Sequence, residues 1–279
     1  MGQDAASEAH HCRNTNVGSH FSGQMRVLLV MIFTFSLISA NGQTRLYILG
    51  TVHNPTKNYT ADSILNILKR LKPDLILEEL DSTFFTADFK LKKENKTNEA
   101  VGVEKYISAY PTPIRPYEIS GRNEYYRMHN TFKLEKESFN KLSSIKRRLD
   151  SHQRKMYSDF LELNKKLRII GEKTPFDINQ QSTYDLVENR QRLMYKDFLK
   201  IYEAREELKD FREFYKENGD YWDRRNKTMS ENIISFINMD DFRNKTIVVL
   251  TGFYHKYYLL NELRQKQERH KFTIKEYYD

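Results

Sequence analysis

Apolar and polar positions near residue 50 predict a strand–helix–strand unit. Arg45–Leu49 is a short apolar run, typical of a buried strand, and it leads into Gly50-Thr51-Val52-His53. Thr60 is the predicted N-cap of a helix whose apolar residues recur at three- and four-residue spacing. Asp74–Leu80 predicts the second strand. Because the three elements fit into about 35 residues, the strands are expected to be parallel, with the helix as their crossover.

Three more strands are predicted later in the chain. Ile114–Ile119 is the third, and Pro116 within it indicates a sheet edge or a bulge. Thr246–Thr251 is strongly β-branched, and a helix through Leu259–Arg264 follows it. Phe272–Ile274 is a candidate last strand. These elements predict an α/β fold with a mixed, largely parallel sheet flanked by helices.

The region between the third and fourth strands, residues 122–239, is charge-rich and has a helical pattern. Phe139–Leu167 and Tyr184–Lys216 carry apolar and aromatic residues at three- and four-residue spacing. We expect long antiparallel helices that form a cap, punctuated by Pro175 and Gly219.

The N-terminal pattern predicts export from the cytoplasm. Met25-Arg26 gives a short basic start, and Val27–Ala40 is an apolar run that is too short for a comfortable transmembrane helix. We expect a signal peptide at about 25–42, behind an upstream extension of residues 1–24, and a periplasmic or extracellular mature protein. A buried element of the domain or an uncleaved anchor are the alternatives. Residues 43–279 are then expected to form a single domain.

Composition narrows the chemistry further. The net charge is +8, but Lys and Arg are scattered among Asp and Glu without a basic block or a nucleic-acid motif. We therefore expect no nucleic-acid partner, and a membrane contact only through the N-terminal signal segment. The one cysteine, Cys12, precedes the predicted mature start, so a thiol nucleophile, a zinc-thiolate site and a disulfide scaffold are not expected.

The candidate chemistry lies at strand ends. Two separate strands are each followed by Gly-x-x-His, which ends at His53 and at His255, and the strand Asp74–Leu80 delivers Glu78 and Glu79. Ligands bind outside the carboxyl ends of the strands in open α/β sheets. Successive side chains of a strand point to opposite faces, so we choose Glu79 and keep Glu78 in reserve. Two imidazoles and one carboxylate bind a divalent metal or act as base and acid.

Four motifs in this order resemble the TraB/PrgY/GumN/Tiki family, within the wider group that includes erythromycin esterase and ChaN. They are LGTVH at Leu49–His53, PDLILEELD at Pro73–Asp81, RRNKTM at Arg224–Met229 and VVLTGFYH at Val248–His255. The resemblance covers the two ends of the domain. Residues at about 123–221 match no family pattern and read as a lineage-specific helical insertion.

The resemblance implies roles for individual residues. The family's paired histidines fall on His53 and His255, its acid on Glu79 and its arginine on Arg225. Some members resemble metal-dependent peptidases, which implies Mn, Co or Zn bound by the two histidines and the acid; erythromycin esterases use a histidine to activate water, and ChaN binds haem. Arg225 is expected to stabilise an oxyanion or to hold Glu79 in place. Glu118, after the third strand, is expected to join the ligand-binding rim.

Three functions remain open at this point. The leading one is an exported hydrolase of a small-molecule ester or a peptide, catalysed by His53, Glu79, His255 and Arg225. The second is a non-catalytic protein of the same fold that binds haem, a metal or a small molecule. The third is an interaction protein whose long basic helices bind a partner.

Overall fold

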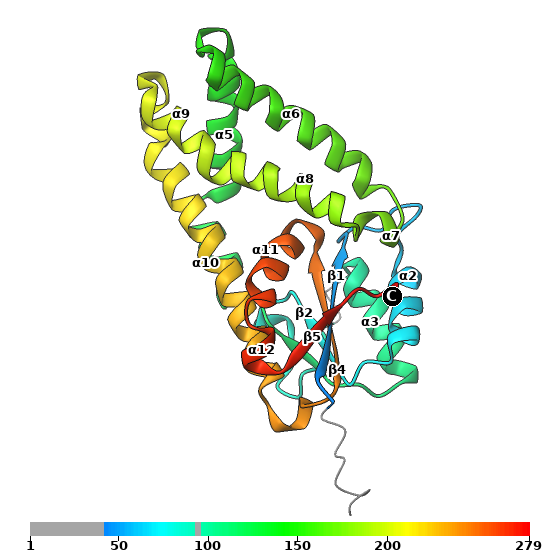
Figure 1. Ribbon diagram of the computed structural model, residues 1–279. Helices are drawn as coiled ribbons and strands as arrows, with labels where there is room; N and C mark the ends of the chain where they lie inside the picture. The colour runs from blue at the N-terminus through cyan, green and yellow to red at the C-terminus, as the bar shows by residue number, and fades with distance from the viewer. Residues whose placement is uncertain (1–41, 93–95) are drawn as a thin grey trace, which may run out of the picture. The chain divides into compact units, whose positions relative to one another are not determined.

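The described part of the chain is built around a five-stranded sheet in which every pairing is parallel (Figure 1). Its order is β3-β2-β4-β1-β5. The strands are β1 (Thr44–Thr51), β2 (Leu75–Glu78), β3 (Ile114–Pro116), β4 (Thr246–Gly252) and β5 (Phe272–Lys275). This confirms the α/β fold, and it places β3 at an edge, where Pro116 lacks an N–H to donate.

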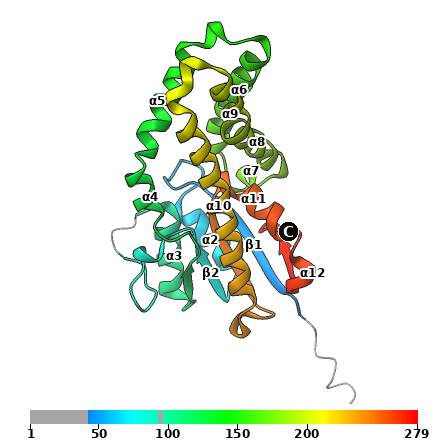
Figure 2. The same ribbon diagram turned by 90° about the vertical axis from the view of Figure 1, so that its left-hand side faces the viewer.

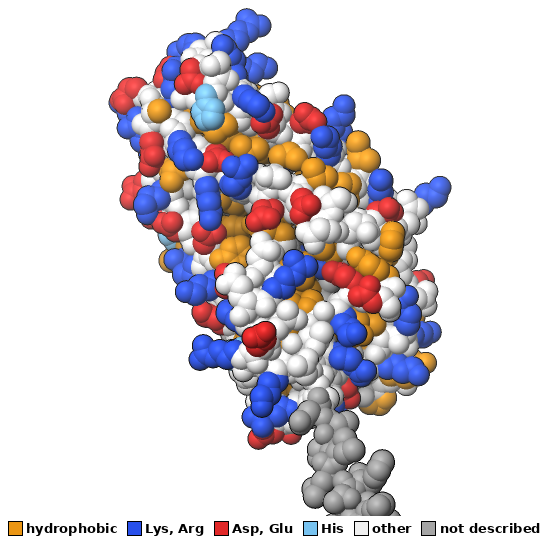
Figure 3. Space-filling model, in the orientation of Figure 1, with side chains coloured by type: hydrophobic (Ala, Val, Ile, Leu, Met, Phe, Trp, Pro, Cys, Tyr) orange, Lys and Arg blue, Asp and Glu red, His pale blue; other side chains and the backbone are white. Residues whose placement is uncertain are grey.

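The computed structural model describes residues 42–92 and 96–279, and Gln43–Asp279 form one compact unit. The predicted extension 1–24 and nearly all of the predicted signal peptide 25–42 lie outside the described residues. Within the described ranges, no helix has the length and the apolar character that crossing a membrane requires. Figure 3 shows Lys and Arg interspersed with Asp and Glu over the visible face, which agrees with the scattered charge of the sequence.

The last long strand, β4, occupies the centre of the sheet. It pairs with β1 from Arg45↔Thr246 to Thr51↔Gly252, and with β2 on its other side. All seven residues of β4 are buried, as their β-branched and apolar sequence favours. β1 and β2 are therefore parallel, as predicted, but β4 lies between these two strands.

Helices cover both faces of the sheet (Figure 2). On one face, α2 (Ala61–Leu71) and α3 (Asn98–Ala109) pack their apolar residues against Val248 and Leu250. On the other face, α10 (Arg212–Ile237) and α11 (Phe253–Arg264) pack against Val249 and its neighbours. Alternate residues of β4 thus serve two separate apolar cores.

The predicted helical cap is present beyond the carboxyl ends of the strands (Figure 1). Its helices have their own apolar core, which includes Leu142, Phe160, Phe198 and Tyr202. The other α-helices of the described chain are α4 (Arg122–Met128), α5 (Thr131–Ser144), α6 (Ser151–Gly171), α7 (Pro175–Ile178), α8 (Gln181–Arg192), α9 (Phe198–Ala204) and α12 (Gln267–His270).

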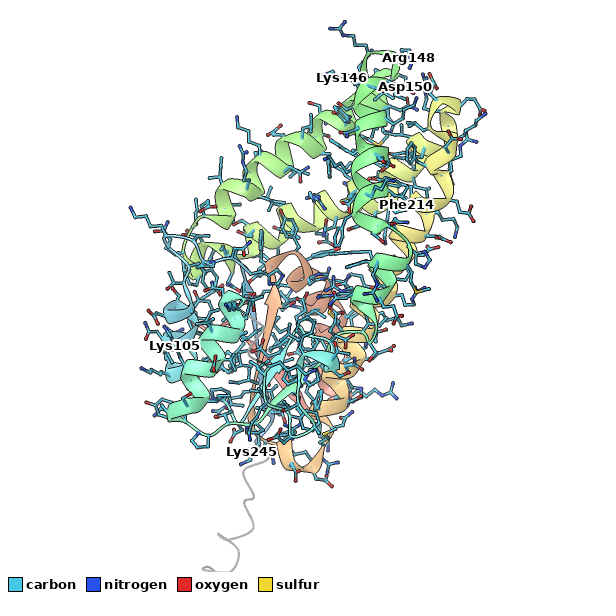
Figure 4. All side chains as sticks on the ribbon, turned by 180° about the vertical axis from the view of Figure 1, so that it is seen from behind. Lys105, Lys146, Arg148, Asp150, Phe214 and Lys245 are labelled. Atoms are coloured by element: carbon cyan, nitrogen blue, oxygen red, sulfur yellow. The ribbon has the colours of Figure 1, made fainter. Side chains whose placement is uncertain are left out.

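Both long helical segments are interrupted where we predicted continuity. Phe139–Leu167 breaks before α6, because the carboxylate of Asp150 caps that helix by accepting from the backbone N–H of Gln153. Figure 4 shows Asp150 with Lys146 and Arg148 at the end of the cap farthest from the sheet. Tyr184–Lys216 is divided by a π-helical turn and by a 3-10 turn at Glu206–Phe211.

We expected Gly219 to interrupt a helix, but it lies inside α10. A Cβ atom at this position would lie 2.7 Å from the carbonyl oxygen of Tyr195. The glycine is therefore needed for close packing of α10 against the π-helical turn. Pro175, in contrast, stands at the first position of α7, as a helix start favours.

Candidate functional site

The carboxyl ends of the central strands face the cap. Figure 4 shows this for β4, since Lys245, the residue directly before this strand, lies at the end of the sheet away from the cap. His53 follows β1 by two residues, Glu79 follows β2 directly, and Glu118 follows β3 by two residues. His255 lies in the first turn of α11, which begins earlier than the helix we predicted. All four residues thus reach one rim of the sheet, as the rule for open α/β sheets predicts.

Arg225 is the centre of the buried half of this site. It occupies α10 together with Trp222, Asn226 and Met229, at a spacing that places all four on the buried face of the helix. Only 6% of the Arg225 side chain is exposed. Its Nη2 donates to Glu79 Oε1 at 2.7 Å, and its Nε donates to Glu118 Oε1 at 2.9 Å. Arg225 therefore holds two carboxylates that burial would otherwise penalise.

His255 is the fourth member of the buried half, and its protonation follows from its partners. Arg225 can only donate, so Nη1 donates to His255 Nε2 at 2.9 Å. The other ring nitrogen, Nδ1, must then carry the proton and donate to Asn226 Oδ1 at 2.6 Å. Burial lowers the pKa of His255 well below its ordinary value, and the positive charge of Arg225 lowers it further. His255 is held as a neutral ring, and Trp222 stacks on it.

Glu79 lies between the buried half of the site and the end of β4, and both of its carboxylate oxygens accept hydrogen bonds. Its Oε2 accepts from the hydroxyl of Thr251 at 2.6 Å and from the backbone N–H of Gly252 at 2.7 Å. Its Oε1 accepts from Arg225 and lies 3.5 Å from His255 Nε2. The carboxylate is fixed by the end of β4 on one side and by α10 on the other.

His53 belongs to an open half of the site, and 58% of its side chain is exposed. Its Nδ1 lies 2.9 Å from Glu99 Oε1, an oxygen that also accepts from the hydroxyl of Thr51. This hydrogen bond to Glu99 raises the pKa of His53 above its ordinary value. The side chain of Thr97 caps α3, and the backbone N–H of Asn98 donates to the carbonyl of His53, so the helix start brings Glu99 to the histidine.

A cleft of about 170 Å³ opens beside His53. Its lining combines acidic, basic, small and apolar residues: His53, Glu78, Glu79, Leu80, Thr97, Glu99, Arg122, Leu250 and Gly252. Glu78 and Glu79 both reach the cleft because β2 ends at Glu78, so the alternation of a strand no longer separates them. Burial, together with the negative charges of Glu99 and Glu79, raises the pKa of Glu78 to about 8.

Gly252 is placed where the cleft leaves no room for a side chain. A Cβ atom on Gly252 would lie 3.3 Å from His53 Nε2 and 3.7 Å from Glu79 Oε2. The glycine of the second Gly-x-x-His therefore lets the ring from the first one approach the strand end. Gly50 has a different neighbour, because its N–H and C=O are both bound by the Asn179 side chain of the cap.

The structure separates the predicted site residues into two groups. Glu79, Arg225, Glu118 and His255 are in direct contact, whereas His53 lies on the other side of Glu79, in the cleft. Of the two roles that we considered for Arg225, the contacts match the holding of Glu79. Sequence reasoning missed Glu99, because an acid in the first turn of a capped helix is an ordinary helix start and carries no sign of a partner.

The predicted metal ligands His53, Glu79 and His255 do not form a donor set that fits a divalent cation. The Nε2 of His255 accepts from Arg225, so a cation bound there would face a guanidinium. Within the described residues, no group of three or more His, Cys, Asp or Glu side chains is arranged to hold a metal ion. The acidic lining of the cleft does not fit haem either, because the macrocycle needs an apolar pocket around its axial ligand.

Comparison of the chain with known proteins gives no match: no family model, no curated protein and no solved structure matches it. The resemblance of the four motifs to the TraB/PrgY/GumN/Tiki family therefore stays a prediction. What the protein does has to be inferred from the geometry of the rim and from the chemistry of the residues there.

Proposed function

We propose that this protein is an exported hydrolase of ester or peptide bonds, in which His53 activates water. The observation that carries the proposal is the different surroundings of the two nitrogens of its ring. Nδ1 is bound to Glu99 at 2.9 Å, while Nε2 forms no hydrogen bond with any described residue and lies at the cleft beside Gly252. A histidine oriented by a carboxylate, with its second nitrogen directed to a substrate pocket, is the arrangement of a general base.

The chemistry follows from this geometry. With Nδ1–H donating to Glu99, the lone pair of Nε2 takes a proton from a water molecule as its oxygen adds to the carbonyl carbon. The tetrahedral intermediate then expels the alcohol or amine, which receives that proton from Nε2. The products are a carboxylic acid and the leaving group, and His53 returns to its neutral form. The negative charge of Glu99 stabilises the imidazolium between the two proton transfers.

Arg122 is the group that supports negative charge in this cleft. It lines the cleft, and its positive charge acts on the His53 ring. Among the carboxylates of the described residues, only Glu118 is within ion-pair distance of Arg122, at 3.0 Å. The side chain of Arg122 is 19% exposed and lines the cleft, so it is accessible to a bound substrate. Arg225 is enclosed by its own partners, and we assign it the positioning of Glu79 rather than contact with an oxyanion.

This proposal favours the water-activating members of the resembled group over the metal-dependent ones. It keeps His53 in the role that the motif resemblance implies. It replaces His255 as the second catalytic group by Glu99, since both nitrogens of His255 are bound. Export rests on the apolar run Val27–Ala40 alone.

A screen of the purified protein on chromogenic esters and peptide anilides tests the proposal, with Glu99→Gln as the informative variant. We expect hydrolysis by the wild type, and in Glu99→Gln a fall in kcat of about 10²-fold or more, because the amide does not stabilise the imidazolium. The pH at which kcat rises should also move down in the variant, since the bond to Glu99 raises the pKa of His53.

Glu104→Gln is the matched control, because Glu104 is an exposed acid on the same helix. It should leave both the rate and the pH profile unchanged. Hydrolysis that survives Glu99→Gln with the wild-type pH profile would show that another group activates the water.

A further inference from the structure

Two residues that line the cleft each have a buried carboxyl oxygen without a hydrogen-bond partner. These oxygens are Glu78 Oε1 and Glu99 Oε2. Glu78 is 1% exposed and Glu99 is 6% exposed. Among the buried polar side-chain atoms that lack a partner in the described part of the chain, these two are the only carboxyl oxygens. Buried acceptors in native proteins are normally satisfied, and leaving one unpaired destabilises the fold.

The charges around the cleft point in the same direction. Arg225 binds Glu79 and Glu118, and Arg122 binds Glu118 as well, so these two cations are balanced by two anions. What remains is Glu99, together with Glu78 once its proton is released, and both line the cleft beside one ionisable ring, that of His53. When His53 is neutral, as a base must be, no cation among the described residues is paired with either carboxyl group. A ligand that brings a positive charge and N–H donors supplies what is missing.

We propose that Glu78 and Glu99 form a subsite for the ammonium group of the substrate, so that the hydrolase acts on α-amino esters or amides. The inference rests on the function proposed above. Glu99 Oε1 holds His53, so an ammonium group on Oε2 of the same carboxylate lies next to the base. This position suits an α-amino group, which is two bonds from the carbonyl carbon that is attacked.

Three further observations favour an ammonium group. Three or more metal-ligating side chains are not assembled within the described residues, whereas an ammonium group needs only acceptors around its three N–H bonds. The volume of about 170 Å³ accommodates the head of an aminoacyl group rather than a long chain. Arg122, the cation that lines the cleft, is directed to Glu118 at 3.0 Å. It can meet the carbonyl oxygen while the ammonium group lies on the glutamates.

The test measures binding separately from turnover. L-Alaninol carries the ammonium group but no scissile carbonyl, and N-acetyl-L-alaninol is its uncharged counterpart. By titration calorimetry on the full chain, we expect L-alaninol to bind at least about 10-fold more tightly than N-acetyl-L-alaninol, because hydrogen bonds from a charged donor are stronger than those from a neutral one. This comparison needs no variant. Equal binding of the two compounds, or no binding of L-alaninol, overturns the proposal.

Glu78→Gln then assigns the site. We expect it to weaken L-alaninol binding by about 10-fold or more, while Glu104→Gln leaves binding unchanged. Because the variant removes a buried unpaired acid, its melting temperature should not fall, and a thermal melt checks this. Retained L-alaninol affinity in a folded Glu78→Gln protein contradicts the assignment. Mn²⁺ or Zn²⁺ that displaces L-alaninol and depends on Glu78 also overturns it, in favour of a metal site.

The two proposals fail in different ways. A protein that binds L-alaninol through Glu78 but hydrolyses no ester or peptide retains the ammonium subsite and loses the hydrolase. A protein that hydrolyses N-acetylated and free α-amino substrates equally well, without binding L-alaninol, retains the hydrolase and loses the subsite. On an active enzyme, we expect alanine 4-nitroanilide to be cleaved with a kcat/KM at least about 10-fold above that of its N-acetyl derivative.

Discussion

The two Gly-x-x-His segments end at the same rim but have opposite environments. His53 is half-exposed, uses one ring nitrogen for Glu99 and leaves the other at the cleft. His255 is buried, and both of its ring nitrogens are bound. The pKa of His53 is raised by a carboxylate, and that of His255 is lowered by burial and by Arg225. One short motif thus places one histidine at an open cleft and the other in a closed hydrogen-bond network.

The difference shows that the neighbours of a histidine, rather than its motif, decide its role. The open half of the site, formed by His53, Glu78 and Glu99, has unsatisfied acceptors and solvent access. The buried half, formed by His255, Arg225 and Glu118, has paired charges and a stacked indole. We expect substitutions in the open half to change catalysis and substitutions in the buried half to change stability.

The largest expected effect is the loss of turnover in His53→Ala. Removal of the general base should lower kcat/KM on the screened substrates by about 10²–10⁴-fold, while the melting temperature stays close to that of the wild type. His152→Ala, at an exposed position on α6, is the matched control and should retain full activity. If His255→Ala abolished turnover in a fully stable protein while His53→Ala did not, the assignment of the two histidines would be reversed.

The next effect is on folding. Arg225→Met leaves Glu79 and Glu118 buried without their partner, so the free energy of unfolding should fall by about 3–5 kcal/mol. Denaturant titration measures this change. Arg224→Met removes the neighbouring exposed arginine, which lies over the ring of Tyr221, and should cost about 1 kcal/mol or less. Equal losses in both variants would contradict a buried half held by Arg225.

The smallest of the three expected effects is a pH-dependent gain in the stability of the Glu78→Gln variant. Glu78 has a pKa of about 8 in the fold against 4.5 for the free side chain, so the folded state keeps a proton that the unfolded state releases. The wild type should therefore lose stability as the pH rises from about 4.5 to about 8, and the full loss is present above pH 8. Glu78→Gln should remove this loss, a gain of about 1–3 kcal/mol at pH 9 and none near pH 4.

Thermal melts at pH 4 and pH 9 measure the gain. A Glu78→Gln protein that is less stable than the wild type at pH 9 would indicate that the carboxylate has a partner in the fold. A gain of equal size at both pH values would indicate a packing effect instead of a charge effect.

The sequence predicted the parts that depend on local pattern. Periodicity predicts the strand positions and the N-cap at Thr60. The parallel connection of the strands predicts that His53, Glu79 and Glu118 lie at one rim.

What the sequence did not predict depends on contacts between distant segments. The position of β4 between β1 and β2 is set by pairing across about 200 residues, and no local signal specifies it. The bond between His53 and Glu99 requires α3 to pack against the loop after β1. Gly219 was misread because a glycine that ends a helix and a glycine that permits close packing are identical in sequence.

The central position of β4 has a consequence for the biosynthesis of this protein. A nascent chain that has not yet extended to Thr246 lacks both strand partners of β1, since β4 and β5 are made last. Thr251 and Gly252, which fix Glu79, are also missing from such a chain. Every incomplete translation product therefore carries His53 without a formed cleft. The site of the proposed hydrolase is therefore completed only when synthesis is nearly finished, and fragments that end before β4 should have no hydrolase activity.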